Sequence, residues 1–175
     1  MELKVLAPGR HWMARTKERR KLAEITSPLG MIDVIRGPMS ASAHPREFLE
    51  RWEFVLDGAD LLLVDDMRVP GYGARKRVAA ESTVLLQGVP GHLSGARTLR
   101  PSKRFVALTW GGNRITAKVG RPRYSIRDAT GAECAAFIGK SWTFHRADPA
   151  VVAFAAFFVS ASIEPMLMSP LLELA

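Results

Sequence analysis

The sequence predicts a mainly β fold in which a closed antiparallel β-barrel wraps around a C-terminal apolar α-helix. Short apolar runs recur along the 175 residues, and a turn containing Gly, Asp or Asn follows most of them. The 14 glycines and 11 prolines are spread along the chain, which favours strands and turns over long helices. One segment, Ala150–Ile163, is apolar on nearly all sides, and such a helix has to be surrounded by other elements. In a strand-rich chain, a sheet wrapped around the helix meets this requirement.

The first half of the chain contains three recognisable strand regions. Met1–Leu6 is short and precedes a Pro-Gly pair, and Gly30–Gly37 alternates apolar and polar residues up to a proline. Arg51–Asp66 indicates a hairpin, because an Asp-Gly pair separates two apolar runs. Arg10–Glu24 is rich in Lys and Arg without a clean helical stripe, so an irregular basic arm and a strand both stay open there.

The second half contains more strands at a similar spacing. We expect a strand at Ser82–Gln87 and a loop at Gly88–Gly95, which contains Gly and Pro. Five further strands are expected between turns: Arg104–Trp110, Arg114–Val119, Arg123–Asp128, Glu133–Ile138 and Ser141–His145. Short strands with a turn after each are typical of an antiparallel barrel or sandwich.

The terminal helix has clear signals for its start and its end. Asp148 is a good N-cap residue, and Pro149 suits the first helical position, where a missing N–H costs nothing. Pro165 is expected to end the helix. A membrane span needs about 20 apolar residues, and a shorter run is more typical of a buried core helix. The segment therefore favours a core helix over a membrane span.

Composition indicates one basic globular domain that spans residues 1–175. Hydrophobic residues make up 47% and charged residues 24%, which is ordinary for a folded domain. The formal net charge of +8 favours anionic partners such as nucleic acid, an anionic membrane surface or a phosphorylated ligand. The alternative is that the charge only keeps the protein soluble. The single cysteine, Cys134, cannot form an intramolecular disulfide, so a reducing cytoplasmic location is the simplest interpretation.

The residue patterns of catalytic and metal centres are missing. The four histidines lie far apart and lack the spacing of metal ligands. Ser141 and Cys134 lack the Gly-x-Ser-x-Gly type of turn that exposes a nucleophile, and we expect Cys134 to fill space inside a hairpin. We therefore expect a non-enzymatic protein that uses no cofactor and no metal.

The stretch from Arg104 to Ile163 carries a loose family pattern. It contains the strand Phe105–Trp110, the turn Gly111–Asn113, the segment Tyr124–Asp128 before a Gly-containing turn, and Trp142 ahead of the apolar helix. This order resembles the tubby-like superfamily, which comprises tubby C-terminal domains, plant LURP-one-related proteins and phospholipid scramblases. The resemblance implies a closed barrel of about twelve strands around a C-terminal hydrophobic helix. Tubby domains bind phosphoinositide headgroups, so it also implies lipid binding, without assigning residues to that role.

Three clusters of cations are the candidate binding residues. They lie in expected loops or at strand starts: Arg75, Lys76 and Arg77; Arg97, Arg100, Lys103 and Arg104; and Arg121 with Arg123. In a barrel, neighbouring loops gather at one rim, and the guanidinium group of Arg suits phosphate oxygens. One shared binding face and three separate solvated patches are both open interpretations. A shared face would hold an anionic ligand or phospholipid headgroup and place the protein peripherally at a membrane surface.

Two other functions remain open. A nucleic-acid-binding module would need exposed aromatic residues beside the cations, and aromatic residues make up only 8% of the chain. A protein-interaction scaffold is the other possibility, because the apolar tail Met166–Ala175 is expected either to cover the barrel mouth or to dock on a partner.

Overall fold

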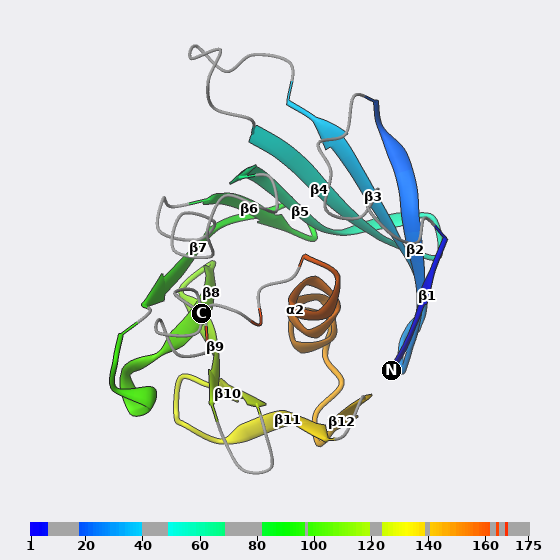
Figure 1. Cartoon of the computed structure of the whole chain (residues 1–175). Coiled ribbons are helices and arrows are strands. Elements are labelled where there is room, and N and C mark those ends of the chain that lie inside the picture. The colour runs from blue at the N-terminus through cyan, green and yellow to red at the C-terminus, as the bar shows by residue number, and fades with distance from the viewer. Residues whose placement is uncertain are drawn as a thin grey trace, which may run out of the picture.

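An antiparallel sheet curls around the C-terminal helix in the computed structural model of the chain (Figure 1). The structure describes residues 1–6, 18–39, 49–68, 82–96, 98–119, 124–138, 141–161, 164 and 167. The twelve strands pair in chain order, each with the next, so the sheet is a continuous meander. The predicted mainly β class with an enclosed C-terminal helix is confirmed.

The strands and helices have the following bounds. The first six strands are β1 (Glu2–Val5), β2 (Arg20–Ser27), β3 (Gly30–Pro38), β4 (Leu49–Leu56), β5 (Ala59–Arg68) and β6 (Ser82–Leu86). The last six strands are β7 (Val89–Ala96), β8 (Phe105–Trp110), β9 (Asn113–Val119), β10 (Tyr124–Asp128), β11 (Glu133–Ile138) and β12 (Ser141–Phe144). A short 3-10 helix η2 (Pro101–Lys103) precedes β8, and α2 (Pro149–Ser160) follows β12.

The connections between strands alternate between two ends of the sheet, because neighbouring strands are antiparallel. One end, here called the hairpin end, has short turns such as Asp57-Gly58 and Gln87-Gly88. Both residues of each turn have positive φ, which is the geometry of the two-residue hairpin turns that match the twist of a sheet. The opposite end, here called the basic end, joins β1 to β2, β3 to β4, β5 to β6, β7 to β8, β9 to β10 and β11 to β12.

The core lies between the inner face of the sheet and α2. Inward residues alternate along the strands, as in β4, where Trp52 and Phe54 are fully buried. Phe154 and Phe157 of α2 are also fully buried, and the rings of Phe157 and Phe54 meet edge to face with centroids 6.0 Å apart. Ten of the twelve residues of α2 are buried, so the helix is the central element of the core. Among the described residues, no helix is long and apolar enough to cross a membrane.

The start of α2 is as predicted, and its end is earlier. Asp148 caps the helix by accepting a hydrogen bond from the Val151 N–H at 3.0 Å, and Pro149 is the first helical residue. The helix ends at Ser160, where the Ser160 hydroxyl donates to the Ala156 carbonyl. Pro165 therefore lies beyond the helix that it was expected to end.

The predicted closure of the barrel is wrong, because the sheet is open between β1 and β12. No ladder joins these two edge strands in the described part of the chain. Next to this opening, the Met1 amino group, just before β1, donates a hydrogen bond to the Trp142 carbonyl of β12 at 3.4 Å. Each of the two edge strands has only four residues, and each pairs with one neighbour, β1 with β2 and β12 with β11. After β12, the backbone N–H groups of His145 and Arg146 both donate to the Cys134 carbonyl, and the chain leaves the sheet for α2.

The predicted loop at Gly88–Gly95 is also wrong, since Val89–Ala96 forms β7. This strand pairs with β6 on one side and with β8 on the other, and pairing on both sides outweighs its weak strand composition. A Cβ atom at Gly91 would collide with the Thr109 carbonyl oxygen of β8. Gly91 therefore marks a close approach of two backbones, whereas its residue type alone indicated a turn.

An ion pair lies inside the curled sheet near the basic end. The Arg36 guanidinium donates to both carboxylate oxygens of Glu50, from Nε and from Nη2, each at 2.6 Å. Both side chains are buried, and the guanidinium lies over the Trp52 ring at 5.4 Å from its centroid. This bidentate geometry joins β3 to β4 from within the core.

Candidate functional site

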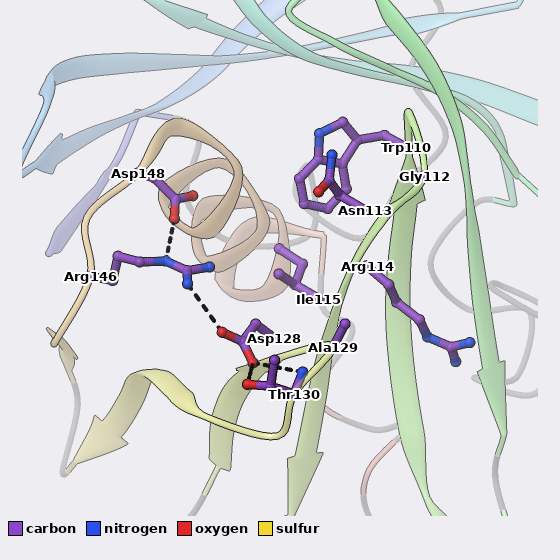
Figure 2. A pocket seen from close by; sticks show the side chains of 10 residues that line it. All are labelled: Trp110, Gly112, Asn113, Arg114, Ile115, Asp128, Ala129, Thr130, Arg146 and Asp148. Atoms are coloured by element: carbon purple, nitrogen blue, oxygen red, sulfur yellow. Dashed lines mark hydrogen bonds and ion pairs between the residues drawn. The ribbon is translucent and has the colours of Figure 1, made fainter.

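A pocket of about 400 Å³ opens at the hairpin end, where α2 begins (Figure 2). Three segments meet there: the β8–β9 hairpin with Trp110 and Asn113, the β10–β11 turn with Asp128 and Thr130, and the connection from β12 to α2. Volumes in this range suit small ligands, so the pocket is the first candidate for a binding site.

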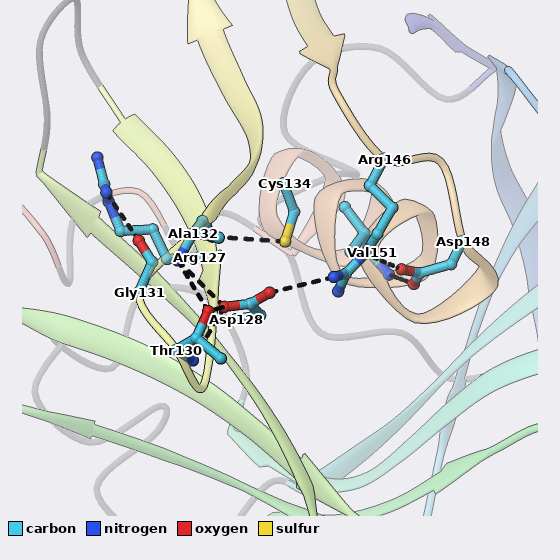
Figure 3. A network of polar contacts seen from close by, with 9 residues as sticks. All are labelled: Arg127, Asp128, Thr130, Gly131, Ala132, Cys134, Arg146, Asp148 and Val151. Atoms are coloured by element: carbon cyan, nitrogen blue, oxygen red, sulfur yellow. Dashed lines mark hydrogen bonds and ion pairs between the residues drawn. The ribbon is translucent and has the colours of Figure 1, made fainter.

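Two aspartates and one arginine form the polar wall of this pocket (Figure 3). Arg146 donates from Nη1 to Asp128 at 3.1 Å and from Nε to Asp148 at 2.6 Å. Asp148 also caps α2, so Arg146 links the start of the helix to the end of β10. The network is a clasp between the helix and the sheet.

The Asp128 carboxylate already accepts four hydrogen bonds from other groups of the protein. One of its oxygens accepts from the Thr130 hydroxyl at 2.6 Å, from the Thr130 N–H at 3.0 Å and from the Ala132 N–H at 3.1 Å. The Thr130 hydroxyl is the main cause that holds the pKa of Asp128 below its usual value, and the backbone N–H groups and Arg146 act in the same direction. Asp128 is therefore ionised at neutral pH, and its carboxylate is hydrogen-bonded to groups of the protein itself.

The charged groups of the pocket therefore serve to hold α2 against the sheet, and we do not assign the pocket as the binding site. The side chain of Arg114, the remaining cation at the pocket's edge, points away from the others (Figure 2) and lies over the Phe105 ring at 5.6 Å. Within the described ranges, no group of three His, Cys, Asp or Glu side chains could hold a metal ion.

Cys134 lies beside this clasp and is buried, as predicted for a core filler. Its thiol donates to the Ala132 carbonyl at 3.6 Å (Figure 3). Burial raises the pKa of the Cys134 thiol, so the group stays protonated and is a poor nucleophile at neutral pH.

The structure describes three of the predicted cations at the basic end. Arg100 and Lys103 are exposed in the β7–β8 connection, while Arg104 is buried. The other predicted cations lie outside the described residues: Arg75, Lys76, Arg77, Arg97, Arg121 and Arg123.

Arg104 has a structural role that its residue type did not reveal. Its guanidinium donates to three backbone carbonyls: Thr98 at 2.7 Å, Leu99 at 2.9 Å and Leu167 at 3.3 Å. It therefore holds the β7–β8 connection against the segment that follows α2. Leu167 is buried in the core, and Glu164 accepts a hydrogen bond from the Tyr124 hydroxyl at 2.9 Å. At these two described positions the segment covers the basic end of the core.

Charge is distributed unequally between the two ends of the sheet. The six connections of the basic end comprise residues 6–19, 39–48, 69–81, 97–104, 120–123 and 139–140. They contain 15 of the 25 Lys and Arg residues of the chain but three of its 17 Asp and Glu residues. Their net charge is therefore +12, and the rest of the chain carries −4.

The two ends differ in the residues of their connections. At the hairpin end, the connections contain one Arg and two Asp, which are Arg146, Asp57 and Asp148. Meander topology thus attaches all three predicted basic clusters to strands that end on the same side. The sequence could not show this, because which end a loop joins depends on the number of strands before it.

No family model, curated protein or solved structure matches this chain.

Proposed function

We propose that the protein is a non-enzymatic binding domain that holds a phospholipid headgroup surface, or another anionic ligand, at its basic end. The observation that carries the proposal is the charge separation: the strand connections of one end have a net charge of +12, in a chain whose total is +8. A surface of one sign attracts the opposite charge over a range of about 10 Å at ordinary salt concentrations.

The ion pairs on the strands also support binding at the basic end. On the strands, cations are mostly matched by carboxylates, as for Lys21 with Asp33, Arg51 with Asp65 and Arg127 with Glu133. Arg100 and Lys103 at the basic end are exposed instead. Cations close to an anionic membrane each contribute about 1 kcal/mol of binding free energy. Several of them at one end would give a stable but salt-sensitive attachment.

A tubby-like or LURP-one-related identity is part of this proposal. A sheet that curls around a buried apolar C-terminal helix supports it, and the open edge between β1 and β12 is a difference from the closed barrel of that group. In this proposal the protein works in the cytoplasm and binds peripherally at the membrane surface.

Flotation of the purified protein with lipid vesicles tests the proposal. We expect co-flotation with vesicles of mixed phosphatidylcholine and phosphatidylserine at low salt. Binding should decrease progressively as salt is raised, because screening weakens attraction between exposed charges. Vesicles of phosphatidylcholine alone should leave the protein unbound.

Two results would contradict the proposal. Equal, salt-insensitive binding to both kinds of vesicle would show that charge does not drive the association. No binding to either, together with tight binding to single- or double-stranded nucleic acid in an anisotropy titration, would favour the nucleic-acid hypothesis instead.

A further inference from the structure

The basic end also exposes aliphatic side chains. Exposed large hydrophobic residues there include Leu99 in the β7–β8 connection, Val119 at the end of β9 and Ile138 at the end of β11; their exposed fractions are 68%, 41% and 48%. In the sequence, a cation follows each of them within two residues: Arg100, Arg121 and Lys140 respectively. Each of these exposed aliphatic residues is thus followed closely by a cation of the same strand connection; Arg121 and Lys140 lie outside the described residues. Leu6, after β1, is 42% exposed and has Lys4 two residues before it.

Three other exposed hydrophobic residues provide a contrast. Met31, Leu85 and Val89 have exposed fractions of 42%, 37% and 41%, and none has a Lys or Arg within two residues. They lie on β3, β6 and β7, toward the hairpin end. Exposure of a hydrophobic side chain is common in proteins, but its regular pairing with cations occurs at the basic end.

Leu99, the most exposed of these residues, lies in a turn whose backbone is fixed by several hydrogen bonds. Arg104 donates to the carbonyls of Thr98 and Leu99, and the Thr98 hydroxyl donates to the Arg100 carbonyl at 2.9 Å. The Lys103 and Arg104 N–H groups close the η2 turn on the carbonyls of Arg100 and Pro101. The backbone around Leu99 is thus fixed while its side chain faces solvent.

We infer that the basic end inserts Leu99, Val119 and Ile138 into the boundary between headgroups and acyl chains of an anionic membrane. This inference rests on the proposed function and specifies how the protein would bind the membrane. Cations draw the end to the anionic headgroups, and the aliphatic side chains then leave water for the acyl boundary, as on amphipathic interfacial helices. Nucleic acid is a poorer fit to this surface, because aliphatic side chains offer no ring on which bases can stack.

A triple variant with a matched control tests this mode. The test variant is L99S/V119S/I138S, and the control is M31S/L85S/V89S, which removes three hydrophobic residues of similar exposure at the other end. Neither changes the net charge, and all six side chains are exposed, so we expect both to keep the wild-type melting temperature. On mixed phosphatidylcholine and phosphatidylserine vesicles, the test variant should bind at least about tenfold more weakly than wild type. The control should bind within about twofold of wild type.

Surface pressure provides a second readout. Wild-type protein and the control variant should raise the pressure of a phosphatidylserine-containing monolayer, and the test variant should not. If wild type binds vesicles but raises no pressure, and both triple variants bind as wild type does, the insertion is refuted and headgroup binding stands. An equal loss in both triple variants also refutes it. If wild type binds neither vesicles nor monolayers, the proposed function fails together with this mode.

Discussion

Replacing Phe157 by alanine is expected to destabilise the protein by about 3–5 kcal/mol, because the ring is fully buried between α2 and the sheet. The ring meets Phe54 of β4 edge to face, so its removal leaves a cavity in the middle of the core. Domains of this size have a total stability of about 5–15 kcal/mol, so the loss would be a large part of it. Urea denaturation followed by circular dichroism measures it directly.

Val159→Ala in the same helix is the matched control for this prediction. Val159 is partly exposed, and alanine is a good helix former, so we expect a loss below about 1 kcal/mol. If Phe157→Ala were no more destabilising than Val159→Ala, α2 would not be the enclosed centre of the fold.

Replacing Glu50 by glutamine is expected to cost about 3–5 kcal/mol, because it leaves the buried Arg36 guanidinium without its carboxylate. A charge inside the core is tolerated only when it is paired and hydrogen-bonded. Here both contacts are short and Glu50 is 1% exposed, so water cannot replace the carboxylate. Thermal and urea unfolding of the variant would show the loss.

Glu53→Gln on the same strand is the control. Glu53 pairs with Arg19, whose side chain is 62% exposed, and such surface pairs contribute about 0–1 kcal/mol. Equal losses in the two variants would contradict the assignment of the Arg36–Glu50 pair to the interior of the sheet.

Features set by local chemistry were predicted well from the sequence. The Asp57-Gly58 pair forms the expected hairpin turn, with positive φ at both residues. Asp148 and Pro149 begin α2 as expected, because capping depends on residues within one helical turn. The apolar character of the segment after Asp148 was enough to predict that the sheet surrounds it.

Features set by pairing between distant residues were not predictable in the same way. β7 forms because β6 and β8 lie on both sides of it, although its own residues favour turns. Arg100 and Arg104 look alike in sequence, yet one is exposed and the other binds three carbonyls. The Asp128–Arg146 contact joins residues 18 positions apart, and no local pattern indicates it.

The most direct test of the basic end compares two charge variants on anionic vesicles. R100E/K103E changes the net charge of the basic end by −4, and T26E/H92E/R114E changes the hairpin end by the same amount. All five residues are exposed, and the buried Arg104 is left unchanged. At about 1 kcal/mol for each unit of charge near the surface, R100E/K103E should weaken binding about 100- to 1000-fold. The control should bind within a few-fold of wild type; equal losses in the two variants, or a larger loss in the control, would contradict binding through the basic end.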